Sequence, residues 1–413
     1  MTFTRFAWLL VGLGSTSLAC SSDPAASGGP DDTTGSAGDS QGASGGDQVG
    51  SAGNDGSGGS AGAGVTTSAG GAGGGGGMVG GAGGGKAGAA GGGGSGSGVG
   101  GGGAMGPAGP RFIGRFDDAH QSAWSGSSIE LRFTGPALSV TMSGANTWYE
   151  VVVDDGMPSK KQIGGTAMLA TGLAAGPHLV QMVRRAESFD GISKFMSFSV
   201  PDTAMLPQQV PSRRIEVIGD SFAVAYGLEG CADRTNADEN AYLSWGMVTG
   251  RMVKADVHIV AQSGMGMAFS LGLGPTIPDV YGLELGTQNT AKWDFSKYVP
   301  DAVLIDVGEN DQNAKNTAMP PQNVYNAATF KMKYGDFLTT LRTNYPNAWI
   351  YCGSHGDLMT DIQAIVTAKA DPKIKFIAFT GTRTACDYHP DVAGHQAFAN
   401  TAAAALKADL GWQ

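Results

Sequence analysis

The sequence predicts a three-layer α/β/α domain with a parallel sheet, preceded by a small all-β sandwich or jelly-roll domain. From residue 209 to residue 413, short apolar runs typical of buried strands alternate with helical stretches, as in a parallel sheet covered by helices on both faces. Between residues 110 and 208, short strands of alternating polar and apolar residues are separated by Gly and Asp turns, as in a sandwich. We therefore expect two folded domains, at 110–208 and 209–413.

Residues 1–20 have the pattern of an export signal. Arg5 precedes an apolar run at Phe6–Leu13, and small residues follow as far as Cys20. This run is too short to span a bilayer comfortably. The segment Ser17–Cys20 resembles the lipobox of bacterial lipoproteins, with Ser17 in place of the usual Leu and Cys20 as the acylated residue. We expect an exported protein that is lipid-anchored to the bacterial cell envelope, at the outer membrane or cell surface, or that is secreted after simple cleavage.

Residues 21–109 are dominated by Gly, Ser and Ala, with no periodicity and almost no apolar bulk. Such a segment cannot offset the entropy lost on ordering, so we expect a disordered tether. A flexible chain of this length has an end-to-end distance on the order of 50 Å. A low-complexity spacer without a tuned length is the plainer interpretation.

The formal net charge is −10, and the chain has no cluster of Lys and Arg. This argues against nucleic acid or an anionic membrane surface as a partner. We expect a monomer that contacts a membrane only through the lipid on Cys20.

Beyond Cys20 the chain has three further cysteines, Cys231, Cys352 and Cys386. After export they would meet an oxidising compartment. An odd number allows one disulfide and one free thiol, or no pairing at all, and the sequence does not choose between these alternatives.

Each domain has its own run of predicted elements. The first has strands at Ser128–Phe133, Leu138–Met142, Trp148–Val153, Gly176–Val183 and Lys194–Val200, followed by a Pro-rich linker at Pro201–Ser212. The second has strands at Ile215–Ile218, Val257–Val260, Ala302–Val307, Ala348–Cys352 and Ile374–Phe379, with helices at Asn240–Met252, at Thr329–Asn344 and after Pro390. Ligands bind beyond the carboxyl ends of parallel strands, so the residues that follow these strands are the candidate site.

Three of these strand ends have groups suited to stabilising negative charge. Ser221, in Gly219-Asp220-Ser221, stands at a helix entry, where the helix dipole and free N–H groups favour an alkoxide and an oxyanion. Gly264 can bring a bare backbone N–H close to a substrate oxygen. Its surroundings are not a dinucleotide fingerprint, because Phe269 occupies the third Gly position. Asn310 can donate its side-chain N–H to an oxyanion.

The segment Asp387–Pro390 supplies the remaining groups. His389 can take the proton of Ser221, and Asp387 can hold the imidazole in the required tautomer. Taken singly, each of these segments reads as a turn or a helix cap. Together, in this order along the strand ends, they indicate a serine hydrolase.

This four-block pattern resembles the SGNH or GDSL hydrolases, with Ser221 as nucleophile, His389 as base, and Ser221, Gly264 and Asn310 as the oxyanion donors. Over roughly residues 111–413 the sequence is identified as a member of carbohydrate esterase family 2, in which a jelly-roll domain precedes the SGNH domain. The matching segments are Gly114–Asp117, Ile218–Ser221, Ala225–Gly227, Glu239–Tyr242, Ser263–Met267, Trp293–Ser296 and Cys386–Pro390.

Three positions depart from the commonest pattern. Cys386 stands where most SGNH enzymes have the acid, and Asp387 lies one residue later, a spacing that the family itself uses. Glu309 replaces the usual Thr before the oxyanion Asn. It would be solvated and harmless, or it would alter the choice of substrate. Tyr388 replaces the Trp that lies on the sugar, so it is expected to bind substrate by stacking, against the alternative of a packed loop residue.

The resemblance implies removal of O-acetyl groups from a polysaccharide of the xylan or mannan type, or its oligosaccharides, through an acyl-enzyme and without a cofactor. We expect no metal site, since the six His residues show no zinc-like spacing such as His-Glu-x-x-His. The alternatives are a deacetylase of the bacterium's own envelope glycan, a lipid or thioester hydrolase, and a non-catalytic surface carbohydrate-binding protein.

Overall fold

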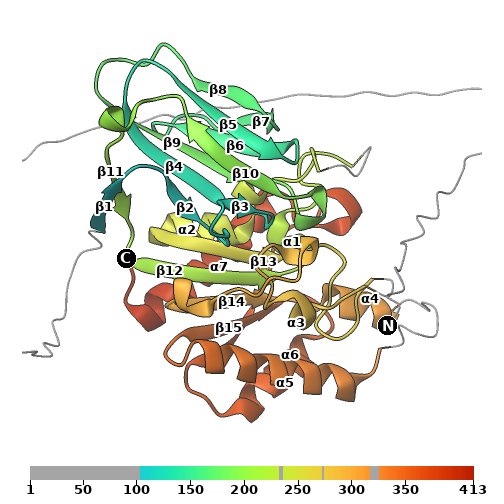
Figure 1. Cartoon of the computed structure of the whole chain (residues 1–413). Helices are drawn as coiled ribbons and strands as arrows, with labels where there is room; N and C mark the ends of the chain where they lie inside the picture. The colour runs from blue at the N-terminus through green and yellow to red at the C-terminus, as the bar shows by residue number, and fades with distance from the viewer. Residues whose placement is uncertain (1–102, 232–235, 272–273, 317–324) are drawn as a thin grey trace, which may run out of the picture. The chain divides into compact units, whose positions relative to one another are not determined.

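The computed structural model describes residues 103–231, 236–271, 274–316 and 325–413 (Figure 1). The predicted export signal, with Cys20, and the tether as far as residue 102 lie outside the described residues. An all-β domain comes first in the described chain and an α/β domain follows, as predicted. Within these ranges, none of the helices combines the length and the apolar content needed to cross a membrane.

Antiparallel strands form two sheets in the all-β domain. In the described part of the chain their orders are β2-β4-β9-β6-β7 and β3-β10-β5-β8. The bounds are β2 Arg111–Ile113, β3 Gln121–Ser122, β4 Ser128–Thr134, β5 Leu138–Gly144, β6 Thr147–Val153, β7 Ser159–Ile163, β8 Thr166–Ala170, β9 Pro177–Arg184 and β10 Ser193–Phe198. Alternation places one face of each strand in the core: in β5, Leu138, Val140 and Met142 are buried and the residues between them are less so.

Two short strands lie where the sequence analysis predicts none. β1 (Ala104–Ala108) pairs antiparallel with β11 (Pro207–Val210). The tether predicted to run to residue 109 therefore ends earlier, and β11 falls within the predicted linker Pro201–Ser212. Gly and Pro make both segments poor strand formers locally, but ladder hydrogen bonds join backbone groups, and Pro is tolerated in a two-stranded edge pair.

Parallel strands form the sheet of the second domain. Among the described residues its order is β13-β12-β14-β15-β16. The bounds are β12 Arg213–Gly219, β13 Ala255–Ala261, β14 Ala302–Asp306, β15 Trp349–Ser354 and β16 Ile374–Ala378. From β12 the chain passes to β13 on one side and then to β14 on the other. The carboxyl end of β12 is thus a topological switch point, where ligands bind in such sheets.

Helices cover both faces of this sheet (Figure 1). Their bounds are α1 Ser221–Val224, α2 Trp245–Val253, α3 Ile277–Val280, α4 Glu309–Asn316, α5 Ala327–Asn344, α6 Met359–Lys369 and α7 Val392–Leu410. The predicted helix Asn240–Met252 is divided into the 3-10 turn η3 (Ala241–Leu243) and α2, because Ser244 between them has an extended backbone.

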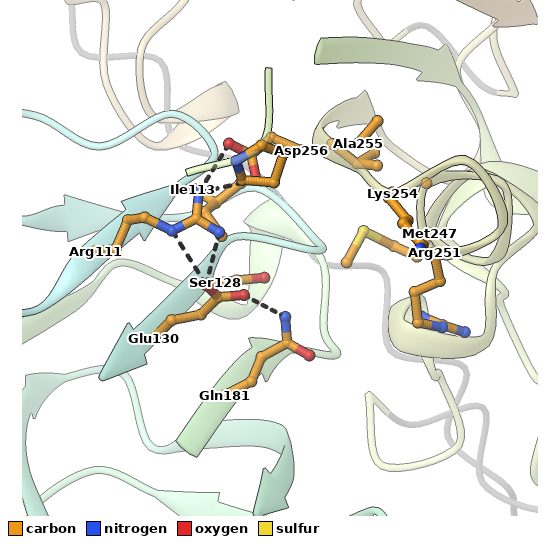
Figure 2. Close-up of a pocket in the computed structure, with 13 residues that line it drawn as sticks. Arg111, Ile113, Ser128, Glu130, Gln181, Met247, Arg251, Lys254, Ala255 and Asp256 are labelled. Atoms are coloured by element: carbon orange, nitrogen blue, oxygen red, sulfur yellow. Dashed lines mark hydrogen bonds and ion pairs between the residues drawn. The ribbon is translucent and has the colours of Figure 1, made fainter. Parts of the chain in front are cut away.

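Ion pairs link the two domains. Arg115 of the all-β domain is fully buried and lies 3.1 Å from Glu216 of β12. Arg111 lies 2.8 Å from Asp256 of β13 and 2.6 Å from Glu130 of its own domain (Figure 2). Charges buried in this way must be paired, so these contacts fix how the sandwich meets the amino-terminal parts of β12 and β13.

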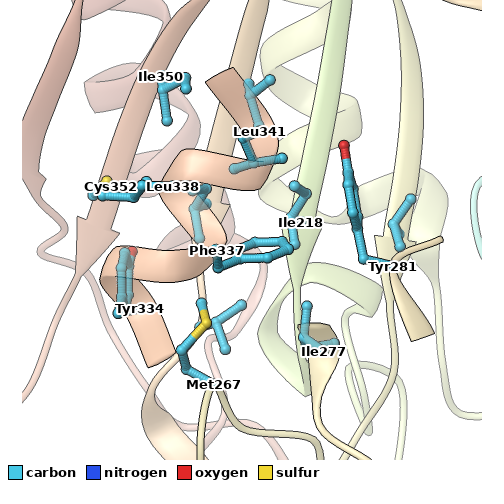
Figure 3. Close-up of a cluster of buried hydrophobic side chains, with 14 of the residues drawn as sticks. Ile218, Met267, Ile277, Tyr281, Tyr334, Phe337, Leu338, Leu341, Ile350 and Cys352 are labelled. Atoms are coloured by element: carbon cyan, nitrogen blue, oxygen red, sulfur yellow. The ribbon is translucent and has the colours of Figure 1, made fainter. Parts of the chain in front are cut away.

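Two apolar clusters form the core on the two faces of the parallel sheet. Phe337 and Leu341 of α5 pack with Ile218 of β12 on one face (Figure 3). Val217, the preceding residue, packs with Phe398 of α7 on the other face. Because adjacent strand residues point to opposite sides, a sheet covered on both faces needs the continuous apolar runs that the sequence contains.

The structure decides between the alternatives for the cysteines. Cys231 and Cys386 form a disulfide. Cys352, in β15, is a free thiol buried in the core (Figure 3). The alternative of one disulfide and one free thiol is therefore the one observed.

Candidate active site

Ser221 lies at the switch point, as the first residue of α1 directly after β12. Only Gly fits at position 219, since a Cβ there would lie 2.3 Å from the Ala223 side chain. Asp220 caps the helix, because its Oδ1 accepts a hydrogen bond from the N–H of Phe222 at 3.1 Å. This turn presents Ser221 to a cavity of about 510 Å³.

His389 meets Ser221 from a loop near the carboxyl terminus, directly after the 3-10 turn η7 (Cys386–Tyr388). Its Nε2 lies 2.7 Å from the Ser221 Oγ, and its Nδ1 lies 2.8 Å from the carbonyl oxygen of Cys386. A carbonyl oxygen only accepts hydrogen bonds, so Nδ1 carries the proton and Nε2 accepts the hydroxyl hydrogen. This is the tautomer that a general base needs.

The Cys386 carbonyl occupies the place beside Nδ1 that was predicted for the Asp387 carboxylate. Asp387 is exposed, has a positive φ of 52° and lines the same cavity. The tight turn η7 folds its backbone carbonyl back onto the ring of His389, which removes the need for a side-chain acceptor. Asp387 acts by charge instead: burial lowers the pKa of His389, and the carboxylates of Glu309 and Asp387 oppose that shift.

Both predicted oxyanion donors line the cavity beside Ser221. Gly264 has a φ of +80°, a conformation that favours Gly and that leaves its backbone uncovered. Asn310 stands in the first turn of α4. Its Nδ2 donates to the Met265 carbonyl at 3.0 Å and lies 3.3 Å from Asp220 Oδ2. The structure therefore brings Ser221, Gly264, Asn310 and His389 to one cavity, as the order of the motifs predicted.

A buried charge network adjoins the site, and two of its members, His355 and Arg383, were not predicted. Glu309 lies 3.0 Å from His355 Nε2 and 3.0 Å from Arg383. His355 Nδ1 lies 3.3 Å from Asp306. Burial lowers the pKa of His355, but the two carboxylates outweigh it and raise the pKa to about 10. His355 is therefore a cation at neutral pH.

This pairing answers the question raised by Glu309. The carboxylate is not solvated, because it is largely buried between two cations that balance its charge. The sequence did contain a signal for His355, since Ser354-His355 follows β15 at the same edge of the sheet as the other site residues. Arg383 follows β16 in the same way, although only after several loop residues.

Tyr388 lies on the rim of the cavity and is 79% exposed, so it is not a packed loop residue. Its φ of 61° turns the chain sharply between Asp387 and His389. The guanidinium of Arg383, which is paired with Glu309, donates to the Tyr388 carbonyl at 2.9 Å. The backbone is thereby held while the aromatic face remains open to a ligand.

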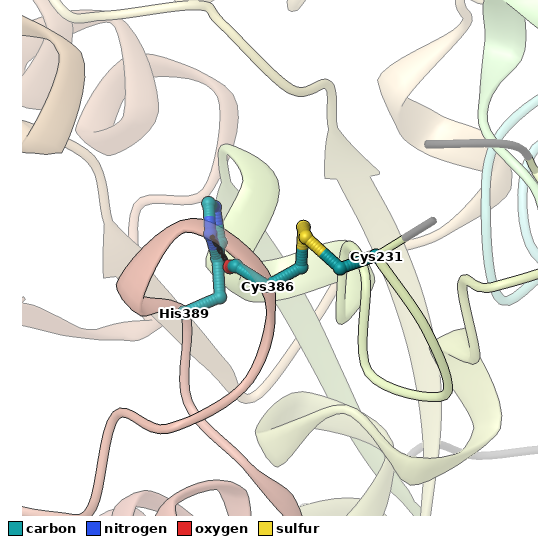
Figure 4. Close-up of a disulfide and its surroundings, with 3 residues drawn as sticks. All are labelled: Cys231, Cys386 and His389. Atoms are coloured by element: carbon teal, nitrogen blue, oxygen red, sulfur yellow. Dashed lines mark hydrogen bonds between the residues drawn. A yellow bond between two sulfur atoms is a disulfide. The ribbon is translucent and has the colours of Figure 1, made fainter. Parts of the chain in front are cut away.

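The disulfide lies next to this histidine loop (Figure 4). Cys386 provides both the sulfur bonded to Cys231 and the carbonyl that accepts the His389 proton. Gly227 allows the close approach, since a Cβ there would lie 2.4 Å from the Cys386 Cβ. The carbonyl that orients the imidazole is thus covalently tied to the segment that follows α1.

The fold and the site together define a serine hydrolase of the GDSL class. The family profile described as "GDSL-like Lipase/Acylhydrolase" matches residues 215–409, and the one described as "Carbohydrate esterase 2 N-terminal" matches residues 112–209. The chain belongs to carbohydrate esterase family 2, which confirms the family predicted from the motifs.

Individual relatives agree with this family. The chain is 34% identical over 331 residues to "Cellulase/esterase CelE" of Acetivibrio thermocellus, covering 73% of this chain and 39% of that protein, so it spans well under half of that relative. It is 29% identical over 248 residues to an "Acetylxylan esterase / glucomannan deacetylase" of Cellvibrio japonicus, covering 57% of this chain and 67% of the relative. Among solved structures, a family two carbohydrate esterase from Clostridium thermocellum in complex with cellohexaose matches with a TM-score of 0.67 and 32% identity, covering 74% of this chain and 100% of that chain.

Proposed function

We propose that this protein is a serine esterase that removes O-acetyl groups from a polysaccharide of the xylan or mannan type. The observation that carries the proposal is the 2.7 Å contact between Ser221 Oγ and His389 Nε2 in a cavity that also presents Gly264 and Asn310. The names of the relatives support an acetylated glycan as substrate, and cellohexaose in a related structure supports a saccharide site.

In the proposed mechanism Ser221 Oγ attacks the acetyl carbonyl and transfers its proton to His389 Nε2. The Cys386 carbonyl stabilises the imidazolium that forms, because it accepts the Nδ1 hydrogen. His389 then gives the proton to the departing sugar oxygen. Water, activated by the same ring, cleaves the acetyl-enzyme and releases acetate.

The developing oxyanion is held by the backbone N–H groups of Ser221 and Gly264 and by the Nδ2 of Asn310. The contact of Asn310 with Asp220 is long, at 3.3 Å, so it is the one that an oxyanion can replace. The second contact, to the Met265 carbonyl at 3.0 Å, keeps the amide in place during the reaction.

Tyr388 is the proposed platform for the sugar. Its ring is exposed on the rim of the cavity that contains Ser221. A flat aromatic face at such a position suits the apolar face of a pyranose ring, and the phenol hydroxyl can bond a sugar hydroxyl.

Acetate release by the full-length protein from acetylated xylan, acetylated glucomannan and a series of 4-nitrophenyl esters tests the proposal, with Ser221→Ala as the control. We expect Ser221-dependent release that is fastest for acetyl and strong on one of the two glycans. Preference for long-chain esters would instead identify a lipid hydrolase. Saccharide binding without hydrolysis of any ester would identify a non-catalytic binding protein.

Deacetylation of the bacterium's own envelope glycan is the second candidate, favoured by the lipobox-like segment Ser17–Cys20. A protein anchored through Cys20 would stay next to that glycan. Acetate release from isolated envelope glycan, without release from either plant-type glycan, would select this candidate.

The pH dependence should show the effect of burial on His389. Burial disfavours the imidazolium and lowers the pKa of His389 below its ordinary value of about 6.5, while the neutral ring is the active form. We therefore expect kcat/KM for 4-nitrophenyl acetate to be constant near neutrality and to fall only below that value. Asp387→Asn removes a negative charge that favours the imidazolium, so its acid limb should move to lower pH. A shift to higher pH in Asp387→Asn would contradict this electrostatic role.

A further inference from the structure

Two buried carboxyl groups lie where the all-β domain meets the catalytic loops. Glu187 follows β9 of the all-β domain and is fully buried. Glu239 precedes η3 of the α/β domain and is 1% exposed. Neither belongs to the site described above. Carboxyl groups are almost never buried so completely without a specific partner.

Glu187 contacts the loop that carries an oxyanion donor. Its Oε2 accepts a hydrogen bond from the backbone N–H of Ser263 at 2.5 Å. Ser263 directly precedes Gly264 and lines the active-site cavity. A second contact reaches the same segment, because the hydroxyl of Ser188 donates to the side chain of Gln262. The all-β domain therefore fastens the chain immediately before Gly264.

The two carboxyl groups are each other's partner. Among the described residues no other donor reaches Glu187 Oε1 or Glu239 Oε2, and the two side chains bond to one another. The neighbouring cations are engaged elsewhere: Arg184 donates to backbone carbonyls and a serine hydroxyl, and Arg185 donates to the Glu239 carbonyl and to other carboxylates. Burial raises the pKa of both carboxyls, and for Glu239 the charges of Glu187 and Asp190 add to it.

These contacts are consistent with one proton shared between the two groups. The protonated carboxyl donates to the other, which leaves Glu187 Oε2 as the acceptor for the Ser263 N–H. Hydrogen bonds to an ionised acceptor are short and about twice as strong as neutral ones. A single buried pair thus joins the all-β domain, the segment before η3 and the loop after β13.

We propose that the Glu187–Glu239 pair positions the Ser263–Gly264 peptide so that the Gly264 N–H points at the developing oxyanion. The inference rests on the proposed function and gives the all-β domain a part in catalysis. Glu187 is a positioning residue, since it contacts the loop and not the substrate. Displacing a catalytic group by about 1 Å costs on the order of 10²-fold in rate.

Glu187→Met and Glu187→Gln in the full-length protein separate positioning from packing. Met fills a similar volume but cannot accept the Ser263 N–H. Gln retains the carbonyl acceptor and offers its NH₂ to Glu239. For Glu187→Met we expect kcat for 4-nitrophenyl acetate to fall about 10²-fold with KM within about threefold of wild type, and for Glu187→Gln we expect kcat within about threefold. Should Glu187→Met not fold, Glu239→Met is measured instead, with about a tenfold loss expected.

Arg111→Gln is the matched control. It breaks an ion pair between the same two domains, but Asp256 lies at the amino end of β13 and the catalytic loop leaves the carboxyl end (Figure 2). We expect a lower Tm and an unchanged kcat. A wild-type kcat in Glu187→Met, or an equal loss in Glu187→Gln and Glu187→Met, would overturn the proposal.

The amide resonance of Gly264, assigned by its absence in Gly264→Ala, tests the positioning without any need for turnover. Displacement of this resonance in Glu187→Met, with none in Glu187→Gln, supports the proposal. No displacement in Glu187→Met overturns it. If the wild-type protein hydrolyses no acetyl ester, the proposed function fails, and this resonance still decides whether the pair positions the loop.

Discussion

Replacing Ser221 with Ala should lower kcat for 4-nitrophenyl acetate by roughly 10⁴-fold or more. The hydroxyl is the atom that forms the acyl-enzyme, and in the structure it is the group that His389 Nε2 contacts at 2.7 Å. The oxyanion donors and the substrate cleft remain in this variant, so a small residual rate above the uncatalysed reaction is expected. Single-turnover measurements with the purified full-length protein would quantify the loss.

Ser244→Ala is the matched control for this prediction. Ser244 is also fully buried, but it stands before α2, and its hydroxyl has no hydrogen-bond partner among the residues that the structure describes. Its removal should leave kcat within about twofold of wild type. Near-normal turnover in Ser221→Ala would remove Ser221 from the mechanism and leave the cavity as a binding site.

Replacing His389 with Ala should cost about 10³-fold or more in kcat at neutral pH, whereas Asp387→Ala should cost less than about tenfold. His389 moves the proton at Nε2, and no described side chain other than His389 contacts the Ser221 hydroxyl as a base. The acceptor for Nδ1 is a backbone carbonyl, that of Cys386, which a change of the Asp387 side chain does not remove. Steady-state kinetics of the two variants on one acetyl ester measure the difference.

Asp387→Asn separates charge from hydrogen bonding in this comparison. If Asp387 acts only by its charge, the Asn variant should show the acid shift in the pH profile and nearly the wild-type plateau. Losses in Asp387→Ala as large as those in His389→Ala would show that the side chain orients the imidazole, and the carbonyl would then be a secondary acceptor.

The pattern of the second domain was predictable because it depends on local composition. Strands buried on both faces need consecutive apolar residues, and Val217 and Ile218 illustrate this, since they contribute to opposite cores. Parallel strands also bring their carboxyl ends to one edge of the sheet. The meeting of Ser221, Gly264 and Asn310 therefore followed from the order of strands and motifs.

Other parts of the site have no signature in the sequence. The acceptor for His389 is a backbone carbonyl, and every residue has one, so composition favours the visible carboxylate of Asp387 instead. The neutralisation of Glu309 depends on His355 and Arg383, which lie far from it along the chain and approach it only through the fold. The choice of Cys231 and Cys386 as the disulfide partners depends on proximity in the same way.

The sequence by itself therefore determined the two-domain organisation, the parallel sheet, the family, and the placing of Ser221, Gly264, Asn310 and His389 at strand ends and in the last loop. These features follow from periodicity and from short motifs, which are local properties of the chain. Only the tertiary structure decided the strand β1, the pairing of cysteines, the carbonyl that orients His389 and the contact of Glu187 with the oxyanion loop. Each of these depends on a backbone group or on a neighbour distant in sequence, whose position is set by the packing of the whole fold.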